Sequence, residues 1–364
     1  MGSQTAIPCY FMRGGTSRGP FFLESDLPQH NIELRDRVLL AAMGSPDPRQ
    51  IDGLGGAHPL TSKVGIVRKS NAQGIDLEFL FAQLQPNSDK VDTKPNCGNM
   101  LSAVVPFALE RGIVEAKGDT STFRVLTVNT GMLCDITVGT PGGVIEYTGN
   151  TYIDGVPGTA APIKINFLDT AGSVCSGLLP TGNLMDTICG IDVTCIDNGM
   201  PLVMLRAADV GCTGYETAAE LNQHDRLKQV LEELRLAASR KMGLGDTRDK
   251  SYPKMCLISE PRQGGTINTR CFIPHVCHEA VGVLAAVTIA TACVLEGSVC
   301  NGIVEIAQGC SKNVSVEHPS GEFTIEMTVD KDNPQNVVSA SLLRTARLLM
   351  RGEVMVPNSL FEAH

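Results

Sequence analysis

A cysteine, a glycine and an asparagine, Cys97-Gly98-Asn99, open the predicted helix 99–111. A thiol at a helix N-terminus lies at the positive end of the helix dipole, which favours its thiolate form. The glycine lets a ligand approach the backbone closely, and the N–H groups of the first helical turn can bind a carboxylate. The motif therefore indicates an acid/base group beside an anion site, with a turn around a buried cysteine as the alternative.

Lys63 stands in the predicted strand 60–67, with apolar residues on both sides of it. A lysine that loses water on burial has a lowered pKa, which would make it a usable general base. A solvent-facing lysine on an alternating strand fits the pattern equally well. Lys254 has a similar setting later in the chain, so both lysines are candidates.

Arg13-Gly14-Gly15-Thr16-Ser17-Arg18-Gly19 is a predicted loop of small residues that is rich in hydrogen-bond donors. It could hold an anion through its backbone N–H groups and through a bidentate contact from the Arg13 guanidinium. The glycine spacing fits neither a P-loop nor a dinucleotide-binding fingerprint. A tight turn without a ligand is the alternative.

The segment 270–278 of the second half contains two cysteines and two histidines, but their spacing matches no standard zinc module. We therefore expect no metal site there. Arg270, together with His278 at a predicted helix start, is better suited to binding an anion. His318 and Ser320 precede a predicted strand and could orient a substrate, although each could also be structural.

An internal repeat links the two halves, because similar motifs recur in the same order and at a nearly constant separation. The pairs are Lys63 with Lys254, Cys97 with Cys277, and Asn129 with His318. The repeat predicts two similar α/β lobes, residues 1–179 and 180–344, with a small-molecule cleft between them. In one version of this division the tail 345–364 joins the first lobe.

Hydrophobic periodicity predicts the secondary structure. The expected helices are 34–42, 99–111, 223–242, 279–295 and 340–350. The expected strands are 60–67, 77–84, 123–128, 133–138, 144–147, 162–168, 190–196, 202–206, 255–258 and 323–329.

The composition argues against several classes of protein. The formal net charge is −9, aromatic residues make up 4% and Trp is absent, which disfavours nucleic acid or an anionic membrane as partner. No secretory signal is visible, and the apolar stretch 280–295 is too short to span a bilayer comfortably. The thirteen cysteines include no C-x-x-C pair and are expected to be reduced thiols in the cytoplasm.

Several motifs taken together resemble those of the PrpF family, and the resemblance covers nearly the whole chain. They are Met12-Arg13-Gly14-Gly15-Thr16-Ser17, Met43-Gly44-Ser45-Pro46-Asp47, Gln50-Ile51-Asp52-Gly53-Leu54-Gly55-Gly56, Leu60-Thr61-Ser62-Lys63-Val64, Asn96-Cys97-Gly98-Asn99, Asp154-Gly155-Val156-Pro157-Gly158, Pro180-Thr181-Gly182-Asn183 and His318-Pro319-Ser320-Gly321. The resemblance implies an α+β fold of the diaminopimelate-epimerase type. In that fold two pseudo-symmetric lobes each wrap a mixed sheet around a central helix.

Four further segments look most similar to the 4-oxalomesaconate tautomerase branch of this family, which serves gallate and protocatechuate catabolism. They are 195–201, 214–216, 272–275 and 344–347. The resemblance implies an isomerase without cofactor that carries out a 1,3-allylic proton shift on 4-oxalomesaconate or a close unsaturated tricarboxylate. Its expected partner is that small polycarboxylate, neither nucleic acid nor membrane, with a homodimer as a further expectation.

The resemblance also implies roles for residues: Lys63 is the general base, and Cys97 is a second acid/base or orienting group. Ser17, the Gly98-Asn99 helix start and Arg270 would hold the substrate carboxylates. Two alternatives stay open. The enzyme could act on 2-methylaconitate or methylitaconate, or it could be a two-cysteine racemase or epimerase that uses Cys97 and Cys277.

Overall fold

The computed structural model describes residues 3–168, 170–333 and 336–362. The chain divides into two compact units. The first contains residues 1–168 together with 344–364, and the second contains residues 169–343. The sequence placed the junction after residue 179, eleven positions later than this division. The last strand of the chain belongs to the first unit.

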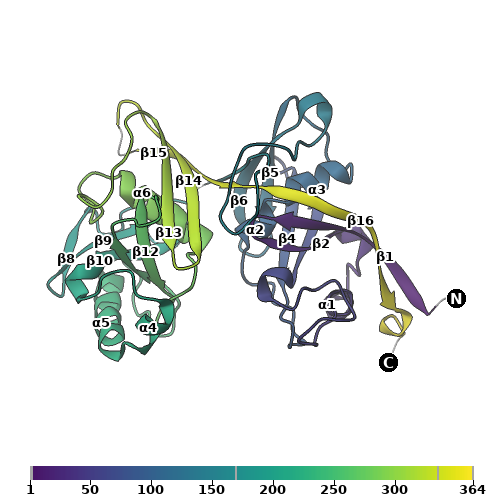
Figure 1. Ribbon diagram of the computed structural model, residues 1–364, viewed down its shortest axis with the longest axis horizontal. Coiled ribbons are helices and arrows are strands. Elements are labelled where there is room, and N and C mark those ends of the chain that lie inside the picture. Colours follow the sequence, from purple (N-terminus) through teal and green to yellow (C-terminus); the bar gives the residue numbers. More distant parts are fainter. Residues whose placement is uncertain (1–2, 169, 334–335, 363–364) are drawn as a thin grey trace. The chain divides into compact units, whose positions relative to one another are not determined.

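The first unit is built on a mixed sheet with the strand order β16-β1-β2-β3-β4-β5-β6-β7. The pairs β2–β3 and β4–β5 are parallel and the others are antiparallel. Figure 1 shows the yellow β16 beside the purple β1. The strands are β1 (Gln4–Gly14), β2 (Ser17–Leu23), β3 (Lys63–Lys69), β4 (Leu77–Gln83), β5 (Thr120–Thr127), β6 (Met132–Gly139), β7 (Ile163–Phe167) and β16 (Ala346–Pro357).

The second unit repeats this topology with the order β8-β9-β10-β11-β12-β13-β14-β15. Its parallel pairs, β10–β11 and β12–β13, occupy the places of β2–β3 and β4–β5. This repeated topology confirms the two similar lobes that the motif order predicts. The strands are β8 (Asp186–Ile188), β9 (Ile191–Asp197), β10 (Pro201–Arg206), β11 (Lys254–Ser259), β12 (Ile267–Phe272), β13 (Ser311–His318), β14 (Gly321–Val329) and β15 (Val337–Arg344).

Each sheet curves around a central helical segment, which confirms the predicted α+β class. In the second unit this is α6 (Val283–Val294), which contacts β9, β10, β13 and β14 and is buried on all sides from Ala285 to Cys293. In the first unit α2 (Gly98–Leu101) and α3 (Val104–Glu110) take this place. A helix with apolar residues all round is stable only inside a protein, as found here.

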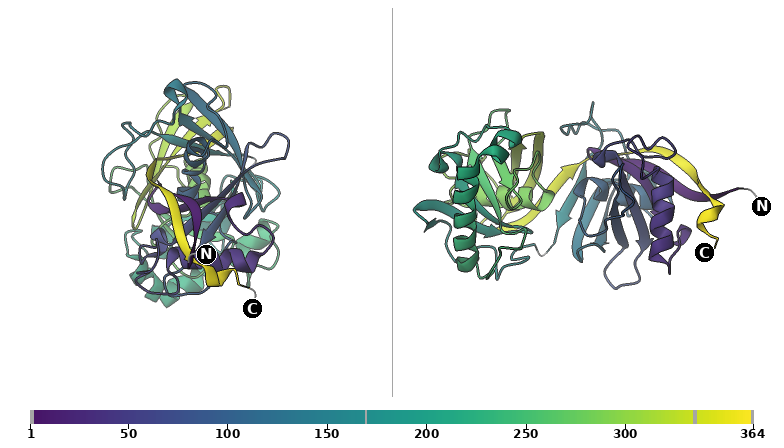
Figure 2. Two further views of the ribbon diagram at one scale, coloured as in Figure 1. Left: turned by 90° about the vertical axis from the view of Figure 1, so that its right-hand side faces the viewer. Right: turned by 90° about the horizontal axis from the view of Figure 1, so that it is seen from below.

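Two longer helices cover the outer faces of the sheets: α1 (Ile32–Met43) in the first unit and α5 (Asp225–Lys241) in the second. Leu227, Leu231 and Leu234 of α5 pack on strand residues of the second core. Figure 2 shows the ribbon of the green α5 beside the strands of its unit. A short helix, α4 (Ala218–Gln223), precedes α5. Short 3-10 turns are η1 (Glu24–Asp26), η2 (Pro59–Thr61), η3 (Pro141–Gly143), η4 (Ala207–Val210) and η5 (Asn358–Leu360). Within the described ranges, no helix is long and apolar enough to cross a membrane.

The sequence prediction was wrong in several places. The segment 340–350 is not a helix but the end of β15 and the start of β16. Its leucine spacing suits both structures. Pairing of β15 with the neighbouring strand β14 and of β16 with the distant strand β1 decides the outcome. Segment 144–147 is not a strand, and helix 99–111 is interrupted at Ser102 and Ala103. The helix predicted to begin at residue 279 begins at Val283.

Candidate active site

Lys63 is the first residue of β3 and is only 7% exposed. Gly65, two positions further along β3, pairs with Phe21, whose ring packs against Phe107 of α3. Because alternate strand residues share a face, Lys63 also points to the side of the sheet that holds the central helix. Its Nζ atom donates to Oε1 of Gln83 at 2.5 Å and lies 5.0 Å from the centre of the Phe81 ring.

Gln83 holds Lys63 through a neutral oxygen. Its Nε2 group donates to the carbonyl oxygens of Pro59, Ser62 and Leu84 at 3.1, 3.2 and 2.8 Å. These three bonds orient the side-chain amide, so that Oε1 is left to accept from the lysine. No carboxylate forms a salt bridge with Lys63 in the described part of the chain. Gln83 belongs to no recognisable motif in the sequence, and its position opposite Lys63 follows only once the pairing of β3 with β4 is known.

Cys97 is the N-cap residue of α2, and its side chain makes no capping hydrogen bond. The thiol is partly exposed. The first helical hydrogen bond runs from Leu101 N to Cys97 O, so the N–H groups of Gly98 and Asn99 precede it and suit an anion. Since α2 packs against β1, β2 and β3, it brings Cys97 and Gly98 to the sheet face that carries Lys63.

Asn99 fastens the β1–β2 turn to the start of α2. Its Nδ2 group donates to Thr16 Oγ1 at 2.9 Å, and its Oδ1 atom accepts from Arg344 Nε at 3.2 Å. The turn fits only because it carries no side chain here: a Cβ on Gly14 would lie 2.3 Å from Asn99 O. A Cβ on Gly15 would lie 2.2 Å from Asn99 Oδ1. The predicted loop 13–19 is therefore mostly strand: it contains the end of β1, a two-residue hairpin turn that supports the site, and the start of β2.

Ser17 lies beside this turn as the first residue of β2, and it is 1% exposed. Its Oγ atom is buried and has no hydrogen-bond partner among the described residues. Oδ1 of Asn96, the residue immediately before Cys97, is likewise buried and has no hydrogen-bond partner among the described residues. Buried polar atoms nearly always have partners, so two unsatisfied ones in segments that meet at the start of α2 are suited to a ligand.

Arg13 does not lie on the sheet face that carries Lys63 and Ser17. It alternates along β1 with Met12 and Gly14, which face the central helix, and therefore points to the other side of the sheet. Its Nη1 group donates to Gly15 O at 2.9 Å and to the O and Oγ1 atoms of Thr345, both at 3.0 Å. Through these hydrogen bonds Arg13 stabilises the β1–β2 turn from the sheet face that points away from the central helix.

In the second unit Lys254 occupies the equivalent position, as the first residue of β11. Burial lowers the pKa of Lys254. The N-cap of the central helix α6 is Gly282, and a Cβ placed on this glycine would lie 3.8 Å from Lys254 Nζ. The structural counterpart of Cys97 is therefore Gly282, which has no thiol.

Cys277 lies elsewhere, which corrects its pairing with Cys97. Phe272 and Cys277 form an isolated β-bridge, and Ile273 N donates to Val276 O, so Cys277 closes a tight turn after β12. Its side chain is 3% exposed and belongs to the apolar core. Burial raises the pKa of the Cys277 thiol to about 12.

The three remaining predicted residues lie together in the second unit. Arg270 is buried in β12, where Nε donates to Glu216 O and Nη1 donates to Asn268 Oδ1 and Thr269 O. Ser320 Oγ donates to the carbonyl oxygen of Glu279, the residue after His278, at 2.7 Å. Burial and the charge of Lys254 lower the pKa of His278.

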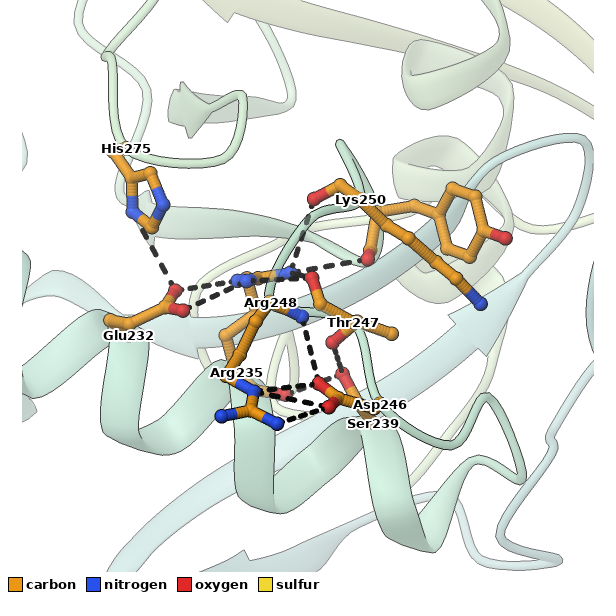
Figure 3. Close-up of polar contacts among 9 residues, drawn as sticks. Glu232, Arg235, Ser239, Asp246, Thr247, Arg248, Lys250 and His275 are labelled. Carbon is orange, nitrogen blue, oxygen red and sulfur yellow. Dashed lines mark hydrogen bonds and ion pairs between the residues drawn. The ribbon is translucent and has the colours of Figure 1, made fainter.

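Figure 3 shows how the segment before Lys254 is held. The guanidinium of Arg235 on α5 is fully buried and donates to the carbonyl oxygens of Thr247, Lys250 and Tyr252. Glu232, one turn earlier, pairs with it at 2.6 Å. A buried charge needs such complete pairing, so this cluster is structural and fixes the entry of the chain into β11.

No group of three or more metal-ligating side chains of the His, Cys, Asp or Glu type occurs within residues 3–168, 170–333 and 336–362. The first unit therefore offers a buried lysine, a thiol at a helix start, a buried hydroxyl and backbone N–H groups. Together these can bind a carboxylate and move a proton to or from carbon.

Comparison with known proteins defines the class. The PrpF protein family model matches residues 4–357. The chain is 52% identical over 97% of its length to 4-oxalomesaconate tautomerase of Pseudomonas putida, of which 97% is covered. It is also 52% identical over 96% of its length to (4E)-oxalomesaconate Delta-isomerase of a Novosphingobium species, with 98% of that protein covered.

A solved structure agrees with this. The crystal structure of methylitaconate-delta-isomerase matches 100% of this chain and 98% of its own, with a TM-score of 0.86 and 33% identity. The chain belongs to the PrpF family. It is an isomerase, as expected from the sequence.

Proposed function

We propose that this isomerase catalyses a 1,3-allylic proton shift on 4-oxalomesaconate or a close unsaturated tricarboxylate. The greater identity to the two 4-oxalomesaconate isomerases than to methylitaconate-delta-isomerase supports this substrate over methylitaconate. The proposed setting is gallate and protocatechuate catabolism in the cytoplasm. The presence of all thirteen cysteines as free thiols is compatible with that compartment.

The observation that carries the proposed chemistry is the environment of Lys63. The side chain is buried, and its nitrogen is bound by the amide oxygen of Gln83 rather than by a carboxylate. A carboxylate partner would add a negative charge that favours the ammonium form, whereas the amide oxygen of Gln83 is neutral. Lys63 is therefore the proposed general base.

The reaction needs one proton transfer in each direction. Neutral Lys63 takes a proton from a carbon next to the conjugated keto acid, and the electron pair of that C–H bond spreads into a dienolate. The proton returns to a carbon two positions away, so a C–H bond forms while the double bond moves, with no net oxidation. Donors aimed at the developing negative charge lower the barrier.

Cys97 is the proposed second acid/base or orienting group. Ser17 Oγ and the N–H groups of Gly98 and Asn99 would donate to a substrate carboxylate, which would satisfy the buried Ser17 hydroxyl. In the second unit, Arg270, His278 and Ser320 stay predictions as carboxylate contacts.

A two-thiol epimerase is the second candidate function, and the glycine at position 282 argues against it. An epimerase of that kind needs a second thiol at the start of the second central helix, where this chain has a glycine without a side chain.

Proton NMR in D2O tests the proposal with 4-oxalomesaconate, 2-methylaconitate, methylitaconate and diaminopimelate as substrates. We expect rapid deuterium incorporation at the allylic carbon of 4-oxalomesaconate, lost in Lys63→Ala and kept in Cys277→Ala. Faster turnover of another acid in the panel would replace the substrate assignment. Normal exchange in Lys63→Ala would overturn the role of Lys63, and exchange at the α-carbon of diaminopimelate that needs Cys277 would favour the epimerase.

A further inference from the structure

Three arginines stand in a row across the first sheet, one on each of three neighbouring strands. Arg13 of β1 pairs directly with Arg347 of β16 on one side and with Arg18 of β2 on the other. Residues directly opposite one another on adjacent strands point to the same face. The three strands lie side by side in Figure 1. We call these three residues the arginine row.

The arginine row is electrostatically unfavourable in the free protein. Like charges that face each other across strands destabilise a sheet. Burial and the nearby charge of Arg347 lower the pKa of Arg13. Several other arginines of this unit have carboxylate partners: Arg35, Arg68, Arg111 and Arg124 form salt bridges. Arg18 and Arg347 are exposed and form none within the described part of the chain.

A pocket of about 560 Å³ lies over the arginine row. All three arginines line it, and the segment 147–160 forms the opposite wall with the hydroxyl-bearing Thr148, Thr151 and Thr159. No aspartate or glutamate is among the lining residues, although the whole protein carries a formal charge of −9. Guanidinium groups bind carboxylate and phosphate in a bidentate manner, and hydroxyls add further donors. The volume falls in the range of small-molecule sites.

The arginine row points to the opposite face of the sheet from the proposed catalytic residues. Gly14 and Ser17 pair with each other and face the central helix, while Arg13 and Arg18, their neighbours in sequence, pair on the other face. Lys63 shares the helix-facing side with Ser17. None of Lys63, Cys97 and Asn99 lines the pocket. The arginine row therefore has no part in the proton transfer proposed above.

We infer that the arginine row binds a small polyanion with two or three carboxylate or phosphate groups. The site is separate from the one that contains Lys63. Such a ligand would neutralise three facing positive charges at once, which no side chain lining the pocket does. Because Arg13 also bonds to Gly15 O and Thr345, the site is joined to the turn that supports Ser17.

Isothermal titration calorimetry at low ionic strength tests this with citrate and pyrophosphate, and with sodium chloride as the monovalent control. The test variant is Arg18→Gln/Arg347→Gln. Its matched control is Arg49→Gln/Lys69→Gln, which removes two exposed positive charges of the same unit. We expect saturable binding of one or both polyanions to the unchanged protein. The test variant should weaken it by about tenfold or more, and the control by less than about twofold.

Binding that is unchanged in the test variant, or equally weakened in the control, would overturn the inference. The Lys63→Ala variant should keep this binding, and its loss there would place the anion on the catalytic face instead. The test variant should keep kcat/KM within about twofold, since a parallel loss would make the row part of the substrate site. Its Tm without ligand should equal or exceed that of the unchanged protein. A marked fall would assign the arginines a structural role and contradict the inference.

Discussion

The two units have the same strand topology and the same lysine at the start of an equivalent strand, but they differ at the start of the central helix. In the first unit, Cys97 caps a four-residue helix and Lys63 binds a neutral amide. In the second, Gly282 caps a twelve-residue helix whose N-cap lies beside Lys254. The two units therefore share their fold, but only the first contains both members of the proposed acid/base pair, Lys63 and Cys97.

The largest expected effect comes from Lys63. General-base catalysis contributes about 10²- to 10⁴-fold, so Lys63→Ala should lower kcat by about that factor. Lys254→Ala should lower it by less than about tenfold, because its partner position is a glycine. Steady-state turnover of 4-oxalomesaconate measures both. Equal losses in the two variants would show that the units contribute symmetrically.

The next largest difference is expected between the effects of replacing Cys97 and Cys277. Cys97→Ala should lower kcat by about tenfold to a hundredfold if the thiol transfers or directs a proton. Cys277→Ala should leave kcat nearly unchanged and instead lower the free energy of unfolding by about 1 kcal/mol, because it removes a buried core atom. Urea unfolding alongside turnover distinguishes the outcomes. A catalytic loss in Cys277→Ala at normal stability would contradict this division.

Gly15 tests how the turn supports the site. Gly15→Ala should reduce the free energy of unfolding by about 1–3 kcal/mol and also lower kcat/KM. It combines a φ of 51° with a clash against Asn99 Oδ1. Gly112→Ala is the matched control, because Gly112 has a φ of 67° but nothing within 4 Å of the new Cβ. The control should lose stability only, and a loss of kcat/KM there would remove the specific role of the turn.

The smallest expected difference is between the rates at which the thiols of Cys97 and Cys277 are alkylated. Since burial raises the pKa of Cys277 to about 12, roughly one molecule in 10⁴ carries its thiolate at pH 8. Cys277 should therefore resist iodoacetamide at pH 8 in the folded protein, and only unfolding should expose it. The partly exposed Cys97 should react first of the two. Mass spectrometry of peptides after timed alkylation measures the order, and faster labelling of Cys277 would contradict it.

The sequence predicted much of the fold, because the information was local or repeated. The motif order gave the two-part repeat, and the leucine spacing 227–234 gave α5. It failed at 340–350, where the same leucines suit a helix or a strand, and where the pairing of β16 with the distant strand β1 is part of what decides the outcome. Pairing across hundreds of residues cannot be seen in a short window.

The candidate site was predicted in part for the same reason. Lys63, Cys97, Gly98, Asn99 and Ser17 were found because they sit in recognisable motifs, and the structure gathers them in the first unit. Gln83 was missed, because its role depends on the register that places it opposite Lys63. Cys277 was paired with Cys97 by order in the sequence, although the helix in its half begins at Val283. Gly282 gave no signal, since a residue without a side chain carries no chemical pattern.

The place of β16 beside β1 has a consequence for synthesis on the ribosome. The second unit is one continuous stretch, so all its strands are translated before the first unit receives its last one. A chain that stops early would contain Lys63 and Cys97 but lack Thr345, which accepts hydrogen bonds from Arg13 at the turn. The residues proposed for catalysis are among the first to be translated, and their supporting sheet is among the last structures to be completed.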